Sequence, residues 1–225
     1  GTGEAILGLN TGLGRAATFL SINPANTSPA VHVTKKGTGA ALLIDHSGST
    51  GDIAVFQDSA LNVARIDKDG KAYFNGGTQA GGADIAEMFA VVGIREEYEP
   101  GDVLVISEES DRTVEKSSSP NSTRIAGVYA SKPGVILTER TINENLNDLV
   151  PMGVIGVIPT KVCDENGPVR RGDILVSSSK RGFAMKAIPV EINGMKIYPS
   201  GAILGKALEN MEKEKGIIKV MVNVK

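Results

Sequence analysis

The chain has 225 residues, of which 41% are hydrophobic and 4% aromatic, and its formal charge is −2. That balance lacks the basic excess of a nucleic-acid-binding protein, so we expect no nucleic-acid partner. A single cysteine, Cys163, excludes an internal disulfide framework, and no apolar run approaches the roughly 20 residues that insert into a membrane.

Short apolar segments separated by turn residues make up residues 1–82. These segments recur about every 11 residues, a spacing that is typical of strands in a β-rich fold. Glycine, aspartate and serine fill the gaps between them and favour tight turns. We therefore predict short strands at residues 30–33, 41–44, 53–56, 63–66 and 72–74.

Strands this short bury little apolar surface. Ordering the backbone costs about 1–2 kcal/mol per residue, so neighbours must supply the missing core, either as turns of a solenoid or as three chains around one axis. So few irregular repeats favour intertwined chains. We predict that residues 1–82 form a homotrimeric β-helix or β-prism shaft.

The two histidines, His32 and His46, lie in this segment. In a trimer, either one would place three imidazoles around the axis, where they could hold a metal ion. The alternative is that both are exposed or stacked imidazoles without a ligand. We expect no cofactor elsewhere in the chain.

Residues 83–148 predict a first β-unit. The unit starts with the run at residues 84–92. Pro100-Gly101 marks a turn, and the runs at residues 103–107, 125–130 and 134–138 read as strands. Residues 149–225 predict a second β-unit with strands at residues 154–158, 174–178 and 217–224 and a turn at residues 164–167. We expect one short helix, at residues 207–215, and a single turn at residues 143–149.

An internal duplication links the two units. The sequence GDVLVIS at residues 101–107 is nearly repeated as GDILVSS at residues 172–178. Each copy is followed by a lysine that ends a small strand, Lys116 or Lys186, and then by a glycine-centred apolar strand. We predict two related units that pack as one barrel-like or sandwich-like head, in which the aspartate of each copy caps backbone amides.

Three motifs carry a family resemblance: GADIAEMF at residues 82–89, PGD at residues 100–102 and IAGV at residues 125–128. They resemble the autocleaving C-terminal domain of phage neck-appendage and tail-fibre proteins, a glutamic-peptidase-like head that acts as an intramolecular chaperone. The short apolar segments of residues 1–82 resemble the trimeric shafts that precede such heads. The resemblance implies a location in a virion tail or appendage, or on an extracellular surface, with other virion proteins as partners.

The resemblance also implies a catalytic pair, Asp84 and Glu87, and a cut at the Ala83–Asp84 bond. One carboxylate would act as base or nucleophile and the other as acid, if their environments split their pKa values. Ala83 departs from a pattern that needs a hydroxyl before the cut. The structural alternative is that Asp84 caps a turn and Glu87 faces solvent or forms a salt bridge with a neighbouring subunit.

The sequence thus favours a structural, adhesive fibre protein that binds a glycan or protein receptor on a cell surface. The alternative is a self-cleaving assembly domain whose only enzymatic activity is autoproteolysis. A glycan-degrading tail spike is a third hypothesis. It would need a pair of acidic side chains in a groove, and the scarcity of aromatic residues argues mildly against a sugar-binding groove.

Overall fold

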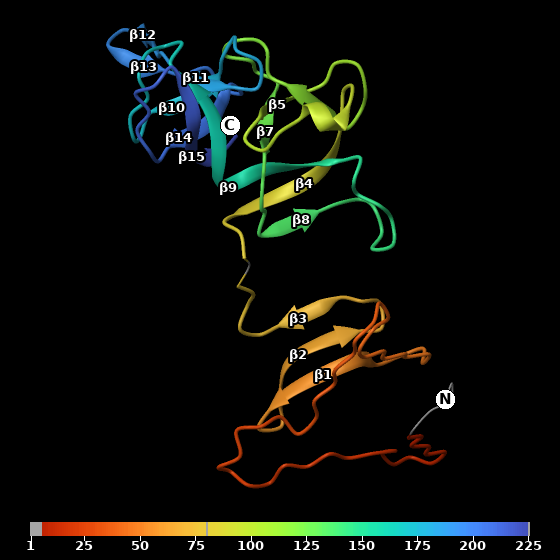
Figure 1. Cartoon of the computed structure of the whole chain (residues 1–225). Helices are drawn as coiled ribbons and strands as arrows, with labels where there is room; N and C mark the ends of the chain where they lie inside the picture. Colours follow the sequence, from red (N-terminus) through yellow and green to blue (C-terminus); the bar gives the residue numbers. More distant parts are fainter. Residues whose placement is uncertain (1–5, 80, 225) are drawn as a thin grey trace. The chain divides into compact units, whose positions relative to one another are not determined.

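The computed structural model describes residues 6–79 and 81–224 and divides into two compact units, residues 1–78 and 79–225. Strands are the main regular secondary structure of both units, and the described residues hold one short 3-10 helix, η1 (Arg95–Glu97) (Figure 1). This confirms the predicted all-β fold. In the part of the chain that the structure describes, no helix is long and apolar enough to cross a membrane.

The first unit contains an antiparallel meander of three strands, β1 (Asp52–Asp58), β2 (Leu61–Asp67) and β3 (Ala72–Phe74). Ser59 and Ala60, which join β1 to β2, both have positive φ, as a tight hairpin turn requires. Three of the five predicted strands are thereby confirmed. The segments predicted as strands at residues 30–33 and 41–44 form no strand within a single chain, because they pair with no described strand of it.

This first unit has no core of its own. Among its described residues no side chain is fully buried. Apolar side chains are widely exposed instead: Leu43 is 84% exposed, Leu42 67% and Phe56 53%. The meander therefore holds its shape through backbone pairing, without the apolar burial that normally stabilises a small sheet.

The second unit is built on one ten-stranded sheet in the order β11-β10-β14-β15-β9-β7-β5-β6-β4-β8 (Figure 1). A separate hairpin joins β12 (Val190–Ile192) to β13 (Met195–Ile197). The strands of the large sheet are β4 (Asp84–Val91), β5 (Val103–Ile106), β6 (Thr113–Lys116), β7 (Ile125–Tyr129), β8 (Val135–Leu137), β9 (Val150–Cys163), β10 (Ile174–Ser177), β11 (Ala184–Lys186), β14 (Ile203–Ala207) and β15 (Lys215–Asn223).

Further pairings close this sheet into two rings that share the long strand β9. Strand β9 pairs with β4 through its first half and with β15 through its second half. The first barrel is β4, β5, β6, β7 and the first half of β9; the second barrel is the second half of β9, β10, β11, β14 and β15. In each barrel one pairing is parallel, β4 with β6 in the first and β9 with β11 in the second.

The two barrels repeat the same register, which confirms the duplication. Leu104 lies opposite Lys116 and Gly127, and Leu175 lies opposite Lys186 and Gly205. The predicted units meet at residue 149, beside β9, the strand that belongs to both barrels. One apolar core, which includes Ile158 and Val162 of β9, spans both rings.

Two further predictions concern the second unit, a helix at residues 207–215 and a buried Cys163. The helix predicted at residues 207–215 is wrong: Leu208 donates its N–H to the Lys219 carbonyl, and Met211 forms an isolated bridge with Val169. These bonds continue the sheet, so a helix is excluded there. Cys163 is buried beside Val176 and Met185, as a small apolar side chain would be.

Candidate functional site

Asp84 is the first residue of β4, and its carboxyl group is buried without compensation. The residue is 9% exposed, and Oδ2 has no hydrogen-bond partner among the described residues. Burial raises the pKa of Asp84 above its ordinary value, because it penalises the charged form. The Asp84 side chain accepts no backbone N–H among the described residues, so it does not have the turn-capping role that was the alternative to catalysis.

The peptide bond before Asp84 lies between two tightly packed backbone segments. Val157 donates its N–H to the Ala83 carbonyl at 3.1 Å, and Gly134 donates to the Asp84 carbonyl at 2.8 Å. A Cβ on Gly82 would come within 2.4 Å of the Lys132 carbonyl oxygen. Residues 82–84 are therefore fixed from both sides.

Glu87 and Asp84 have different environments, although both belong to β4. Successive side chains of a strand alternate between its faces, and the two acids are three positions apart in β4. Asp84 and Ala86 are buried, whereas the Glu87 carboxylate accepts a bond from Arg112 Nη2 at 2.7 Å. Arg112 also contacts Glu139 at 3.1 Å. The structure thus places Glu87 in a salt bridge within its own chain.

The aspartates of the duplicated motif cap the same turn in both barrels. Asp102 Oδ2 accepts the Glu99 N–H at 2.8 Å, and Asp173 Oδ2 accepts the Arg170 N–H at 2.8 Å. Each aspartate also donates its own N–H to the carbonyl of the residue that it caps. The predicted capping role is confirmed in both copies.

Asp102 has a second role that is much weaker in Asp173, whose only lysine contact among the described residues is Lys186 at 3.9 Å. Asp102 is 1% exposed, and its carboxylate contacts Lys161 Nζ at 2.7 Å and Lys116 Nζ at 2.9 Å. Lys161 also binds Glu99 at 2.8 Å. Burial opposes the charge of Lys161, but the hydrogen bonds to Asp102 and Glu99 outweigh it and raise the pKa of this lysine.

This buried charge cluster lies where the two barrels meet. Lys161 comes from the second half of β9, while Asp102 precedes β5 of the first barrel. Gly182, which precedes β11, donates to the Ser117 carbonyl and accepts from the Val103 N–H. Sequence reasoning missed Lys161, because a lone lysine inside an apolar strand shows no partner until the fold is closed.

The histidines lie in the first unit. His32 Nε2 is 3.3 Å from the Thr34 hydroxyl, and His46 Nδ1 is buried without a partner among the described residues. Within the described part of the chain, no group of three or more His, Cys, Asp and Glu side chains is arranged to hold a metal ion. A ring of histidines would need other chains and stays a prediction.

No protein-family model matches the chain, and no curated protein matches it. Among solved structures, it is similar to the pre-mature gene product 12 of bacteriophage phi29, with 16% sequence identity and a TM-score of 0.48. The alignment covers 72% of this chain and 24% of that one. This chain therefore matches about a quarter of the length of the phage protein.

Proposed function

We propose that this chain is the distal part of a homotrimeric, tail-fibre-like virion appendage that attaches to a cell surface. The observation that carries the proposal is the first unit, in which no described side chain is fully buried. Val33, Ile44 and Phe74 are each about half exposed, at 51%, 50% and 52%. A unit that exposes this much apolar surface, both inside and outside its sheet, needs partner atoms to cover it.

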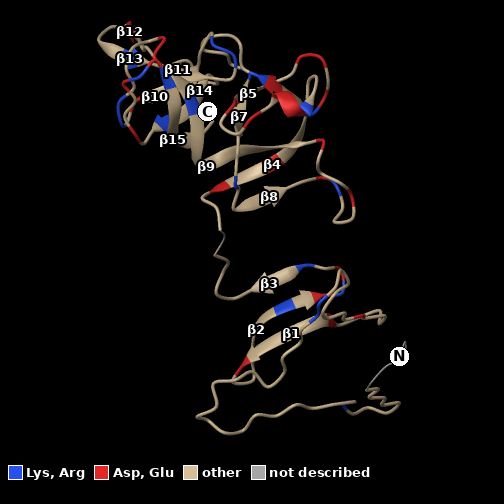
Figure 2. Ribbon diagram, viewed as in Figure 1, with Lys and Arg blue, Asp and Glu red and all other residues tan. Residues whose placement is uncertain are grey.

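Identical partner chains are the occupant that fits this surface. Residues 16–34 include no aspartate, glutamate, lysine or arginine, and the ribbon of the first unit carries charge mainly near its turns (Figure 2). Buried positions in an intertwined shaft must be uncharged, because an unpaired buried charge is costly. Three chains would also give the segments at residues 30–33 and 41–44 the strand neighbours that they lack in one chain.

The second unit has its own core and would form the head of the fibre. The virion location rests on the resemblance of residues 82–89, 100–102 and 125–128 to the heads of phage appendage and tail-fibre proteins. Attachment to a cell-surface glycan or protein follows from a head at the end of a shaft. In this proposal the chain is a structural part, and its partners are its own copies and other virion proteins.

The native mass of the particle in dilute solution tests the proposal. We expect a species of three times the chain mass of 23.5 kDa, and we expect this species to bind host cells. A monomer whose first unit is protected from proteolysis would contradict the proposal, because that unit would then be stable without partner chains.

A second candidate function, self-cleavage at the Ala83–Asp84 bond, is favoured by the buried, unpaired Asp84 carboxyl group. A carboxyl group whose pKa is raised stays protonated to a higher pH and can donate a proton to a leaving amide nitrogen. Water would attack the Ala83 carbonyl carbon while the Val157 N–H stabilises negative charge on the carbonyl oxygen. As the C–N bond breaks, the Asp84 carboxyl group would give its proton to the leaving nitrogen, and the resulting carboxylate would take up the proton that the water loses. In this arrangement Asp84 acts without Glu87.

Intact mass of freshly purified protein over several days tests this second candidate. We expect two fragments that separate between Ala83 and Asp84, and we expect the Asp84→Asn variant to stay intact. Asp111→Asn, which changes an exposed carboxylate, is the matched control and should cleave like the wild type. A wild-type chain that keeps its full mass rules out cleavage at this bond.

A further inference from the structure

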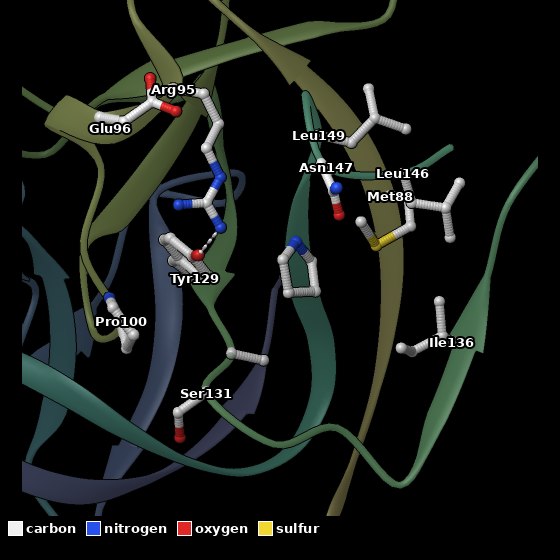
Figure 3. Close-up of a pocket in the computed structure, with 12 residues that line it drawn as sticks. Met88, Arg95, Glu96, Pro100, Tyr129, Ser131, Ile136, Leu146, Asn147 and Leu149 are labelled. Carbon is white, nitrogen blue, oxygen red and sulfur yellow. Dashed lines mark hydrogen bonds between the residues drawn. The ribbon is translucent and has the colours of Figure 1, made fainter. Parts of the chain in front are cut away.

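A pocket of about 490 Å³ opens on the first barrel, between β4, β7 and the segment before β9 (Figure 3). One side is apolar and includes Met88, Ile136 and Leu149. Arg95 of η1 enters from the other side, and its guanidinium points toward Tyr129. The volume lies within the range of small-molecule sites in proteins, roughly 300–1,000 Å³.

The positive charge of Arg95 has no carboxylate partner among the described residues. Its guanidinium donates to the Tyr129 hydroxyl, and the guanidinium carbon is 5.5 Å from the centre of the Tyr129 ring. Its Nε is buried without a hydrogen-bond partner, and no carboxylate of the described residues forms a salt bridge with it. Arg112 and Arg140, by contrast, each bind a carboxylate of this chain.

We propose that this pocket binds a carboxylated sugar of a surface glycan, with the carboxylate on Arg95. A guanidinium presents parallel N–H donors that match a carboxylate in a bidentate pair. The Tyr129 hydroxyl, the Ser131 hydroxyl and the Asn147 amide line the same pocket and can bind sugar hydroxyls. The apolar side would cover the C–H face of the ring.

Glu96 narrows the choice of anion. Its exposed side chain lies at the pocket and makes no salt bridge with the described residues, so it would repel a second negative charge. This repulsion is stronger for a phosphate monoester, which carries about two negative charges at neutral pH, than for a carboxylate, which carries one. The inference rests on the proposed attachment function and names the kind of receptor that the head would recognise.

Binding to the full-length assembly tests the pocket. Glucuronate, galacturonate and N-acetylneuraminate are titrated by calorimetry against their neutral counterparts, glucuronamide, galactose and the methyl ester of N-acetylneuraminic acid. We expect at least one acidic sugar to bind, and its neutral counterpart to bind at least about tenfold more weakly, the effect of losing a charge-assisted pair. Arg95→Gln should remove the difference, and Arg95→Lys should restore part of it.

The matched control is Arg171→Gln, which removes an exposed arginine that lies outside the pocket. It should leave sugar binding unchanged. The proposed sugar site is wrong if none of the three acidic sugars binds, or if the neutral sugars bind equally well. It is also wrong if both glutamine variants lose binding equally. The native mass and cell attachment of the same samples report on the fibre separately, so a trimer that attaches to cells without binding acidic sugars would end only this inference.

Discussion

At the residue scale, the Asp102 carboxylate makes the most buried ion pairs among the described residues, because it contacts two largely buried lysines. Lys116 and Lys161 are 16% and 13% exposed. Asp102→Asn would leave Lys116 without a carboxylate partner in the described part of the chain and Lys161 with only the exposed Glu99. Breaking a buried pair in this way costs about 3–5 kcal/mol. We expect a loss of this size in the free energy of unfolding, measured by denaturant titration.

The duplication supplies the control for this experiment. Asp173 caps the same turn but is 24% exposed, and its nearest lysine, Lys186, is 3.9 Å away. Asp173→Asn should therefore cost about 1 kcal/mol or less. Equal losses in the two variants would show that the shared turn, and not the lysine cluster, makes Asp102 important.

Replacing Asp84 should change the free energy of unfolding in the opposite direction. Because its pKa is raised in the folded state, the folded protein holds the proton more tightly, and this stabilisation is lost as the pH rises through the folded pKa. Asp84→Asn should then raise the free energy of unfolding at pH 7 by about 1 kcal/mol, the lower range for an unsatisfied buried group. The gain should vanish at a pH below the ordinary aspartate pKa of about 3.9.

Denaturant titrations of both proteins across this pH range measure the difference. A variant that is less stable at pH 7 would mean that the Asp84 charge is compensated in solution. Sequence reasoning selected Asp84 through its resemblance to a known motif, but it could not reveal that Glu87 is engaged by Arg112. The face on which a side chain lies depends on the register of β4 against β9, and that register is set by a partner more than sixty residues away.

At the scale of elements, a glycine at the centre of β7 and of β14 lets neighbouring strands approach closely. A Cβ on Gly127 would lie 2.5 Å from the Gly153 carbonyl oxygen, and one on Gly205 would lie 2.2 Å from the Met221 carbonyl oxygen. Neither neighbour can move without shifting its strand. Gly127→Ala and Gly205→Ala should each lower the free energy of unfolding by about 1–3 kcal/mol or more.

Gly81→Ala is the control, since a Cβ there meets no atom within 4 Å and needs no unusual φ. Thermal unfolding of the three variants measures the effect, and similar melting temperatures would contradict it. The same glycines show what the sequence could reveal about the elements. The glycine-centred strands and the Gly-Asp turns are local signals, so the duplication was visible in advance.

The sharing of β9 was not visible in the sequence. Its first half completes one barrel and its second half begins the other, although the run looks like a single strand. Gly156, with a φ of 125°, lies at the change of partner, where a Cβ would come within 2.4 Å of the Ala83 carbonyl oxygen. Nothing local distinguishes this glycine from one in a turn, because its role depends on contacts with distant strands.

At the scale of the whole molecule, the two units should differ in how their stability depends on protein concentration. The second unit has an apolar core within one chain, so its unfolding should not depend on concentration. The first unit has no buried side chain among its described residues, and assembly with partner chains would stabilise it by mass action. Raising the chain concentration should therefore protect the first unit alone.

Hydrogen exchange of the full-length chain, followed by mass spectrometry of its peptides, measures both units in one sample. Peptides from β1 and β2 should exchange more slowly at high concentration, whereas peptides from β9 and β15 should be unchanged. Val63→Asp places a charge in the centre of β2, where the wild-type side chain is 41% exposed, and should abolish the dependence. Slow exchange of β1 and β2 that does not change with dilution would mean that one chain stabilises this unit, and the case for a trimeric shaft would fail.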